Sequence, residues 1–159
     1  MQDRFKFRAV LHQNKYEEYQ LEKFSHQRVF DVMSINSGIE YSTIEIIAEY
    51  PNGDWAVREI DDKDIDLIQC TGLKDKNGKL IYEGDIVSVK VKIQDSLYED
   101  EYYFQNYKGG IIFEKGIIAI DVIDTTKHPI SLYYHAKDCE VIGNIYENTE
   151  LLREGNNAR

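Results

Sequence analysis

The fold is decided by residues 71–87, which read Thr71-Gly72-Leu73-Lys74-Asp75-Lys76-Asn77-Gly78-Lys79-Leu80-Ile81-Tyr82-Glu83-Gly84-Asp85-Ile86-Val87. Asp75 to Gly78 have the composition of a tight turn, because Asn and Gly accept the backbone angles that such turns require. Gly84 and Asp85 then turn the chain into a strand rich in β-branched residues. That combination is typical of small SH3-like barrels, so the sequence predicts a mainly β protein with a partly open, SH3-like barrel core, additional hairpins and one or two short helices.

Apolar residues fall on every second position on both sides of this run, which is the pattern of a strand with one buried face. The clearest case is a strand over residues 87–93, whose apolar face holds Val87, Val89, Val91 and Ile93. A second strand is expected over residues 5–12, where Phe5, Phe7, Ala9 and Leu11 alternate with their neighbours. Both patterns favour sheets that pack one face against a core.

Two hairpins are indicated where turn residues interrupt apolar runs. In the first, residues 43–49 and 55–59 flank Pro51-Asn52-Gly53-Asp54. In the second, Gly116 separates residues 111–113 from 117–122. Further strands are expected over residues 29–33 and 140–146, and a terminal helical turn is expected after Asn148.

The acidic run over residues 61–66 is interpreted as a solvated turn between two lobes. We therefore expect an N-terminal β-rich lobe at residues 1–66, a barrel lobe at residues 67–152 and a flexible tail at residues 153–159. The two lobes could also form one compact unit, because 159 residues fit a single domain.

Composition indicates a folded protein that stays in the cytoplasm. The start of the chain lacks the apolar run of a signal peptide, and no stretch reaches the roughly 18 apolar residues of a membrane span. Cys70 and Cys139 have no metal-ligand spacing and are expected to be small buried hydrophobes. Asp and Glu number 29 against 19 Lys and Arg, so phosphate backbones are repelled unless the basic residues cluster.

Residues with catalytic chemistry are few, and the motifs of phosphate loops, nucleophile elbows and dinucleotide sites are missing from the sequence. The nearest arrangement to a metal site is Asp121, Asp124 and His128, which a strand end followed by a hydrated loop explains better. We therefore predict a protein that is not an enzyme, with no catalytic residues, no cofactor and no metal site.

Two binding surfaces are considered. Aromatic and acidic residues interleave over residues 95–104, which suggests an exposed partner-binding surface that includes Tyr98, Tyr102, Tyr103 and Tyr107. The alternative is a nucleic-acid patch, in which Tyr82 is a stacking platform among Lys74, Lys76, Lys79, Lys90 and Lys92. A net charge of −10 also leaves open an acidic mimic of nucleic acid.

Three segments, residues 6–9, 71–87 and 141–148, together resemble the YopX family of phage and prophage proteins. The resemblance implies a phage origin and an uncharacterised biochemical role, and it implies no catalytic residues. Our first hypothesis is a non-enzymatic protein-interaction or self-assembling module that forms a homo-oligomer or binds a host or phage protein. The alternative is a nucleic-acid-binding barrel, and no membrane partner is expected.

Overall fold

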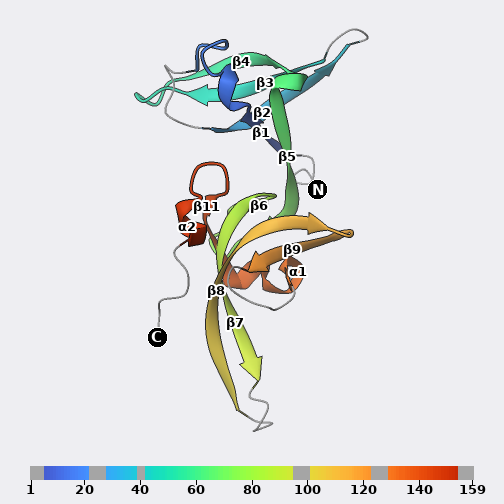
Figure 1. The fold of residues 1–159 in the computed structure, drawn as a ribbon, viewed down its shortest axis with the longest axis vertical. Helices are drawn as coiled ribbons and strands as arrows, with labels where there is room; N and C mark the ends of the chain where they lie inside the picture. Colours follow the sequence, from blue (N-terminus) through green and yellow to red (C-terminus); the bar gives the residue numbers. More distant parts are fainter. Residues whose placement is uncertain (1–5, 22–27, 39–41, 95–100, 123–128, 154–159) are drawn as a thin grey trace. The chain divides into compact units, whose positions relative to one another are not determined.

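The computed structural model of the 159-residue chain describes residues 6–21, 28–38, 42–94, 101–122 and 129–153. These residues confirm the predicted mainly β class with few, short helices (Figure 1). The chain divides into two compact units, Met1–Cys70 and Thr71–Arg159, called unit 1 and unit 2 below. The predicted flexible tail lies outside the described residues except for Arg153, the last residue of a short helix.

Unit 1 is an antiparallel sheet in the strand order β4-β3-β2-β1-β5. Its strands and 3-10 turns are β1 (Phe7–Leu11), η2 (Gln13–Lys15), β2 (Val29–Ser37), β3 (Ser42–Glu49), β4 (Trp55–Asp61), η4 (Asp62–Asp64) and the first residues of β5 (Ile65–Lys74). The apolar core gathers on one side of this sheet around Leu11, Leu21, Phe30, Ile44, Ile46 and Ile60. The strand pattern therefore reflects the alternation seen in the sequence.

Unit 2 contains a second antiparallel sheet, in the order β10-β9-β8-β7-β11, and β6, which pairs with β5. Its elements are β6 (Leu80–Tyr82), β7 (Asp85–Gln94), β8 (Tyr102–Glu114), β9 (Ile117–Val122), β10 (Ile130–Ser131), α1 (Leu132–His135), η5 (Ala136–Asp138), β11 (Cys139–Asn144) and α2 (Glu150–Arg153). In the described residues β10 and β11 are opposite edges of this sheet and do not pair, so a closed barrel is not seen and the SH3-like detail is not confirmed.

Most predicted strands and both predicted hairpins are confirmed, whereas two polar segments match the expectation only in part. The acidic run contains the expected turn, the 3-10 turn η4 with Asp62 and Lys63 exposed, but Asp64 within it is buried and the strand β5 begins directly after it. In the aromatic and acidic stretch over residues 95–104, Tyr102, Tyr103 and Phe104 are exposed as expected but lie on the paired strand β8, and residues 95–100 lie outside the described residues. Tertiary pairing overrode the local polarity in both places.

Asp75 holds the β5–β6 turn against β11. Its buried carboxylate accepts hydrogen bonds from the backbone amides of Asn77 and Lys79, both at 2.9 Å, and of Val141 at 3.0 Å. Burial raises the pKa of Asp75, but the hydrogen bonds from the three amides lower it by more. The pKa therefore lies below its ordinary value. The carboxylate therefore fixes a turn and joins it to a strand distant in sequence.

Glycines allow two close approaches within unit 2. Gly84 has a φ of +75°, and a Cβ there would lie 2.9 Å from Cε2 of Tyr146. A Cβ at Gly109 would overlap the carbonyl oxygen of Asp121 on the neighbouring strand. Only glycine fits these positions without displacing the neighbouring chain.

Both cysteines are buried, as the sequence suggested, and they are not joined in a disulfide. Cys70 is the last residue of unit 1, and Cys139 begins β11 in unit 2. Burial and the nearby Asp75 carboxylate raise the pKa of the Cys139 thiol to about 11, and its Sγ contacts the carbonyl oxygen of Ala136 at 3.2 Å. Among the described residues, no helix has the length and apolar character needed to cross a membrane.

Candidate functional site

The hairpin of β7 and β8 extends beyond the rest of its sheet. β11 follows β7 only as far as Val89, and β9 pairs with β8 only from Gly109 onward. Within the described residues, 90–94 of β7 and 102–106 of β8 therefore pair with each other alone. We call this two-stranded ribbon the arm, and Figure 1 shows its strands running together away from the other strands of unit 2.

One face of the arm combines lysines with aromatic rings. The Nζ atom of Lys90 lies 4.7 Å from the ring centroid of Phe104, and the Nζ atom of Lys92 lies 3.2 Å from that of Tyr102. The two rings are 56% and 55% exposed, respectively. By strand register the basic-aromatic face is formed by Lys90, Lys92, Gln94, Tyr102, Phe104 and Asn106, with Lys108 at its base.

This face is locally cationic in a protein whose formal net charge is −10. None of its positions is occupied by Asp or Glu. Carboxylates lie at both ends of the face: at its base Glu140 is opposite Ser88 and Asp121 is opposite Gly110, and at its far end the exposed Glu101 directly precedes Tyr102. The Glu140 carboxylate already pairs with Lys76 at 2.6 Å, so it neutralises little of the charge on the arm.

The opposite face of the arm continues the apolar core. Val89 and Tyr107 are opposite each other and buried, and the Tyr107 hydroxyl donates a hydrogen bond to Gln105 at 2.9 Å. Farther along the arm Tyr103 is opposite Ile93 and is 51% exposed. Buried packing at the base thus holds the arm in place while its far end stays open to solvent.

The four tyrosines proposed from the sequence do not form one surface. Tyr102 and Tyr103 are exposed but point to opposite faces of the arm, because they are neighbours on one strand. Tyr107 is buried, and Tyr98 lies outside the described residues. Only Tyr102 therefore contributes to the basic-aromatic face.

The structure also divides the proposed lysine patch. Lys74, Lys76 and Lys79 belong to β5 and the turn before β6, whereas Lys90 and Lys92 lie on the arm. Tyr82, expected to be a stacking platform, is 4% exposed and packs in the interior. Its backbone amide donates a hydrogen bond to the Asp85 side chain at 2.9 Å. Tyr82 therefore stabilises the turn that leads into β7.

Sequence reasoning missed Phe104 and Lys108. Their signal was the Lys-x-Lys spacing at Lys90 and Lys92 together with the aromatic-x-aromatic spacing at Tyr102 and Phe104. These two spacings fall on one face only if the chain returns as a paired strand. The signal was therefore visible only after the pairing of β7 with β8 was known.

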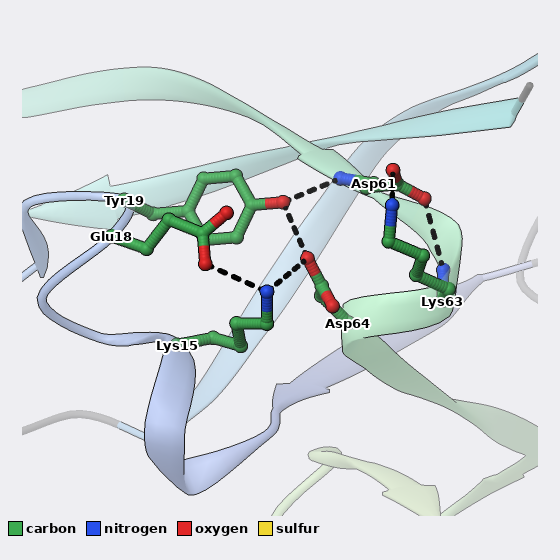
Figure 2. Close-up of polar contacts among 6 residues, drawn as sticks. All are labelled: Lys15, Glu18, Tyr19, Asp61, Lys63 and Asp64. Carbon is green, nitrogen blue, oxygen red and sulfur yellow. Dashed lines mark hydrogen bonds and ion pairs between the residues drawn. The ribbon is translucent and has the colours of Figure 1, made fainter.

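A second polar cluster surrounds the buried carboxylate of Asp64 in unit 1 (Figure 2). The Tyr19 hydroxyl donates to Asp64 at 2.8 Å and accepts from the backbone amide of Asp61 at 3.2 Å. Lys15 pairs with Asp64 at 3.3 Å and with Glu18 at 2.7 Å. The cluster fastens the segment after β1 to the 3-10 turn between β4 and β5.

The groups of this cluster keep their ordinary charge states at neutral pH. The hydrogen bond to Glu18 raises the pKa of Lys15, and burial raises the pKa of Tyr19. Burial raises the pKa of Asp64, but the bonds from Tyr19 and Lys15 outweigh it and leave the pKa lowered. A protonated lysine, a neutral tyrosine and an ionised aspartate stabilise one another and are not poised to exchange protons near pH 7.

The Asp64 cluster predicts a dependence of stability on pH. Because the folded pKa of Asp64 lies below the unfolded value of about 3.9, its contribution is present above that pH and is lost as the pH falls through the folded pKa. Asp64→Asn should therefore lower the free energy of unfolding at neutral pH. The difference in this free energy between the original protein and the variant should narrow on acidification below about pH 4.

Urea unfolding of both proteins between about pH 7 and about pH 3 measures this gap. Fluorescence of Trp55 provides the reading for unit 1, since it is the chain's single tryptophan and lies on β4. A gap that stays constant over that pH range would show that the Asp64 charge does not stabilise unit 1.

No group of three or more His, Cys, Asp or Glu side chains that could hold a metal ion occurs in the part of the chain that the structure describes. Of the three residues considered for such a site, Asp121 is exposed on β9, and Asp124 and His128 lie outside that part.

Comparison with known proteins gives one finding. Residues 6–153 match the model of a protein family described as YopX protein. The matched range contains the Asp75 turn, the arm and the Asp64 cluster. A search of curated proteins returns no match.

Proposed function

Because this chain belongs to the YopX family, whose model matches residues 6–153, we propose that it is a phage- or prophage-encoded interaction protein without enzyme activity. It binds its partner through the arm, in the cytoplasm of the bacterial host. The partner is another macromolecule, either a host or phage protein, a second copy of this chain or a nucleic acid.

The exposed rings of the arm carry this proposal. A two-stranded hairpin without further strands is marginally stable in water, so a ribbon that extends past its sheet gains little for the fold itself. Tyr102 and Phe104 nevertheless leave more than half of their surface open at this ribbon. Large aromatic side chains in such positions are characteristic of the centres of binding interfaces, where a partner covers them.

Photo-crosslinking in host cells tests whether the arm is the contact surface. A photoreactive phenylalanine analogue replaces Phe104 in one variant and Tyr134 in a matched control, since Tyr134 is 77% exposed on α1, outside the arm. We expect adducts from position 104 that exceed those from position 134. The mass of each adduct, compared with 18.6 kDa for the chain, then distinguishes a second copy from another protein.

Equal or absent labelling at the two positions would contradict the proposal. Nuclease treatment of the adducts distinguishes a nucleic-acid partner from a protein partner, because only the former changes in mass. Circular dichroism of each purified variant confirms that the strands remain intact before the comparison is made.

A further inference from the structure

We propose that the basic-aromatic face of the arm binds single-stranded nucleic acid. Tyr102 and Phe104 stack on unpaired bases, and Lys90, Lys92 and Lys108 contact the phosphates. This inference rests on the proposed function, because it takes the arm to be the contact surface and names the chemistry of its partner.

The placement of the two rings supports base stacking. Tyr102 and Phe104 are two positions apart on β8, so their side chains emerge from one face about 7 Å apart along the strand. Aromatic side chains arranged on the face of a sheet can stack two or three successive unpaired bases. Both rings are more than half exposed, so bases can reach them without any rearrangement of the core.

The lysines lie where a backbone would follow the rings. Lys90 and Lys92 already hold their ammonium groups over the rings of Phe104 and Tyr102. When a base displaces the ammonium group from the ring face and stacks there, the lysine stays within reach of the attached phosphate. Lys108 continues the cationic line toward the base of the arm, on the same face.

The charge of the basic-aromatic face differs from that of the protein as a whole, and this difference favours nucleic acid as the ligand of the face. The chain as a whole carries a net charge of −10 and repels phosphates, whereas this face presents lysines without a carboxylate among its positions. Bases in a duplex are stacked on each other and offer no open ring face, so the exposed rings select single strands. An acidic peptide satisfies the lysines, but it leaves the flat ring faces without a matching surface.

Fluorescence anisotropy with labelled oligonucleotides of about 15 residues tests the inference. The probes are oligo-dT, oligo-U, a duplex of equal length and an oligo-Glu peptide, at salt concentrations from ~50 to ~200 mM. We expect both single strands to bind more tightly than the duplex and the peptide. Comparison of the affinities for oligo-dT and oligo-U shows whether the face prefers DNA or RNA.

Two variants on the arm and two matched controls elsewhere make the test specific. Phe104→Leu keeps an apolar side chain but removes the stacking ring, and should weaken binding about tenfold. Lys92→Gln should reduce the slope of log affinity against log salt by about 0.7. The controls Tyr134→Leu and Lys137→Gln replace an exposed ring and an exposed lysine of α1 and η5 and should leave binding unchanged.

Several results would overturn the inference. These are no binding to either single strand, equal binding to the duplex, tighter binding to the oligo-Glu peptide, or equal loss in the control variants. If nucleic acid fails to bind while position 104 still crosslinks to a protein, the inference fails and the proposed function stands. If position 104 gives no specific adduct and no single strand binds, both fail.

Discussion

Replacing Asp75 by alanine is expected to destabilise unit 2 by about 3 kcal/mol, because three backbone amides lose their shared, buried acceptor at once. The amides of Asn77, Lys79 and Val141 all donate to this one carboxylate. Alanine removes the acceptor that these amides share, whose own residue is only 5% exposed. For a unit of this size, the melting temperature should fall by roughly 10–20 °C.

Two matched variants make this result interpretable. Asp75→Asn keeps one acceptor oxygen for the turn amides but places an NH2 group toward the Val141 amide, so its effect should be intermediate. Asp138→Ala removes an exposed carboxylate from the neighbouring 3-10 turn and should change stability little. Thermal unfolding by circular dichroism ranks the three proteins, and equal stability of Asp75→Ala and Asp138→Ala would contradict the role given to Asp75.

Replacing Gly109 by alanine is expected to cost about 3 kcal/mol or more, because the added methyl group meets backbone that cannot move aside. Its Cβ would overlap the carbonyl oxygen of Asp121 and lie 2.7 Å from Cγ2 of Ile120, both on the paired strand β9. The strands β8 and β9 would have to separate at the point where the arm leaves the sheet. Loss of this pairing should also loosen the arm.

The adjacent glycine provides a control at almost the same place. A Cβ at Gly110 meets only Cγ2 of Ile145 at 3.8 Å, which is ordinary contact, so Gly110→Ala should have a small effect. Urea unfolding measures the difference between the two variants, and hydrogen exchange of β8 and β9 locates it. Similar unfolding midpoints for the two alanine variants would show that the strands tolerate a side chain at Gly109.

The sequence predicted those elements whose residues alternate by themselves. The strand around Val89 and the hairpins across Gly53 and Gly116 appear where the apolar spacing placed them. Asp64 could not be predicted to be buried, because its partner Tyr19 is 45 positions away and an acidic run looks solvated in isolation. Long-range partners, which no local pattern contains, decide whether such a carboxylate lies inside.

The candidate site was predictable only in part, for a related reason. Lys90, Lys92 and Tyr102 were singled out by composition, but they had been assigned to two different surfaces. The pairing of β7 with β8 brings them together and adds Phe104. By contrast, Asp75 and Gly84, which belong to the most distinctive motif of the sequence, stabilise turns within unit 2. That motif therefore identifies residues that maintain the fold and not residues of the exposed face.

The two buried cysteines make it possible to time the opening of each half of the molecule separately. Cys70 and Cys139 are both enclosed, and one belongs to each unit. A thiol reagent reacts with the thiolate, which the raised pKa of Cys139 makes scarce while that unit stays closed. The rate at which each sulfur is labelled, followed by peptide mass, therefore records how often its own unit exposes its interior under native conditions.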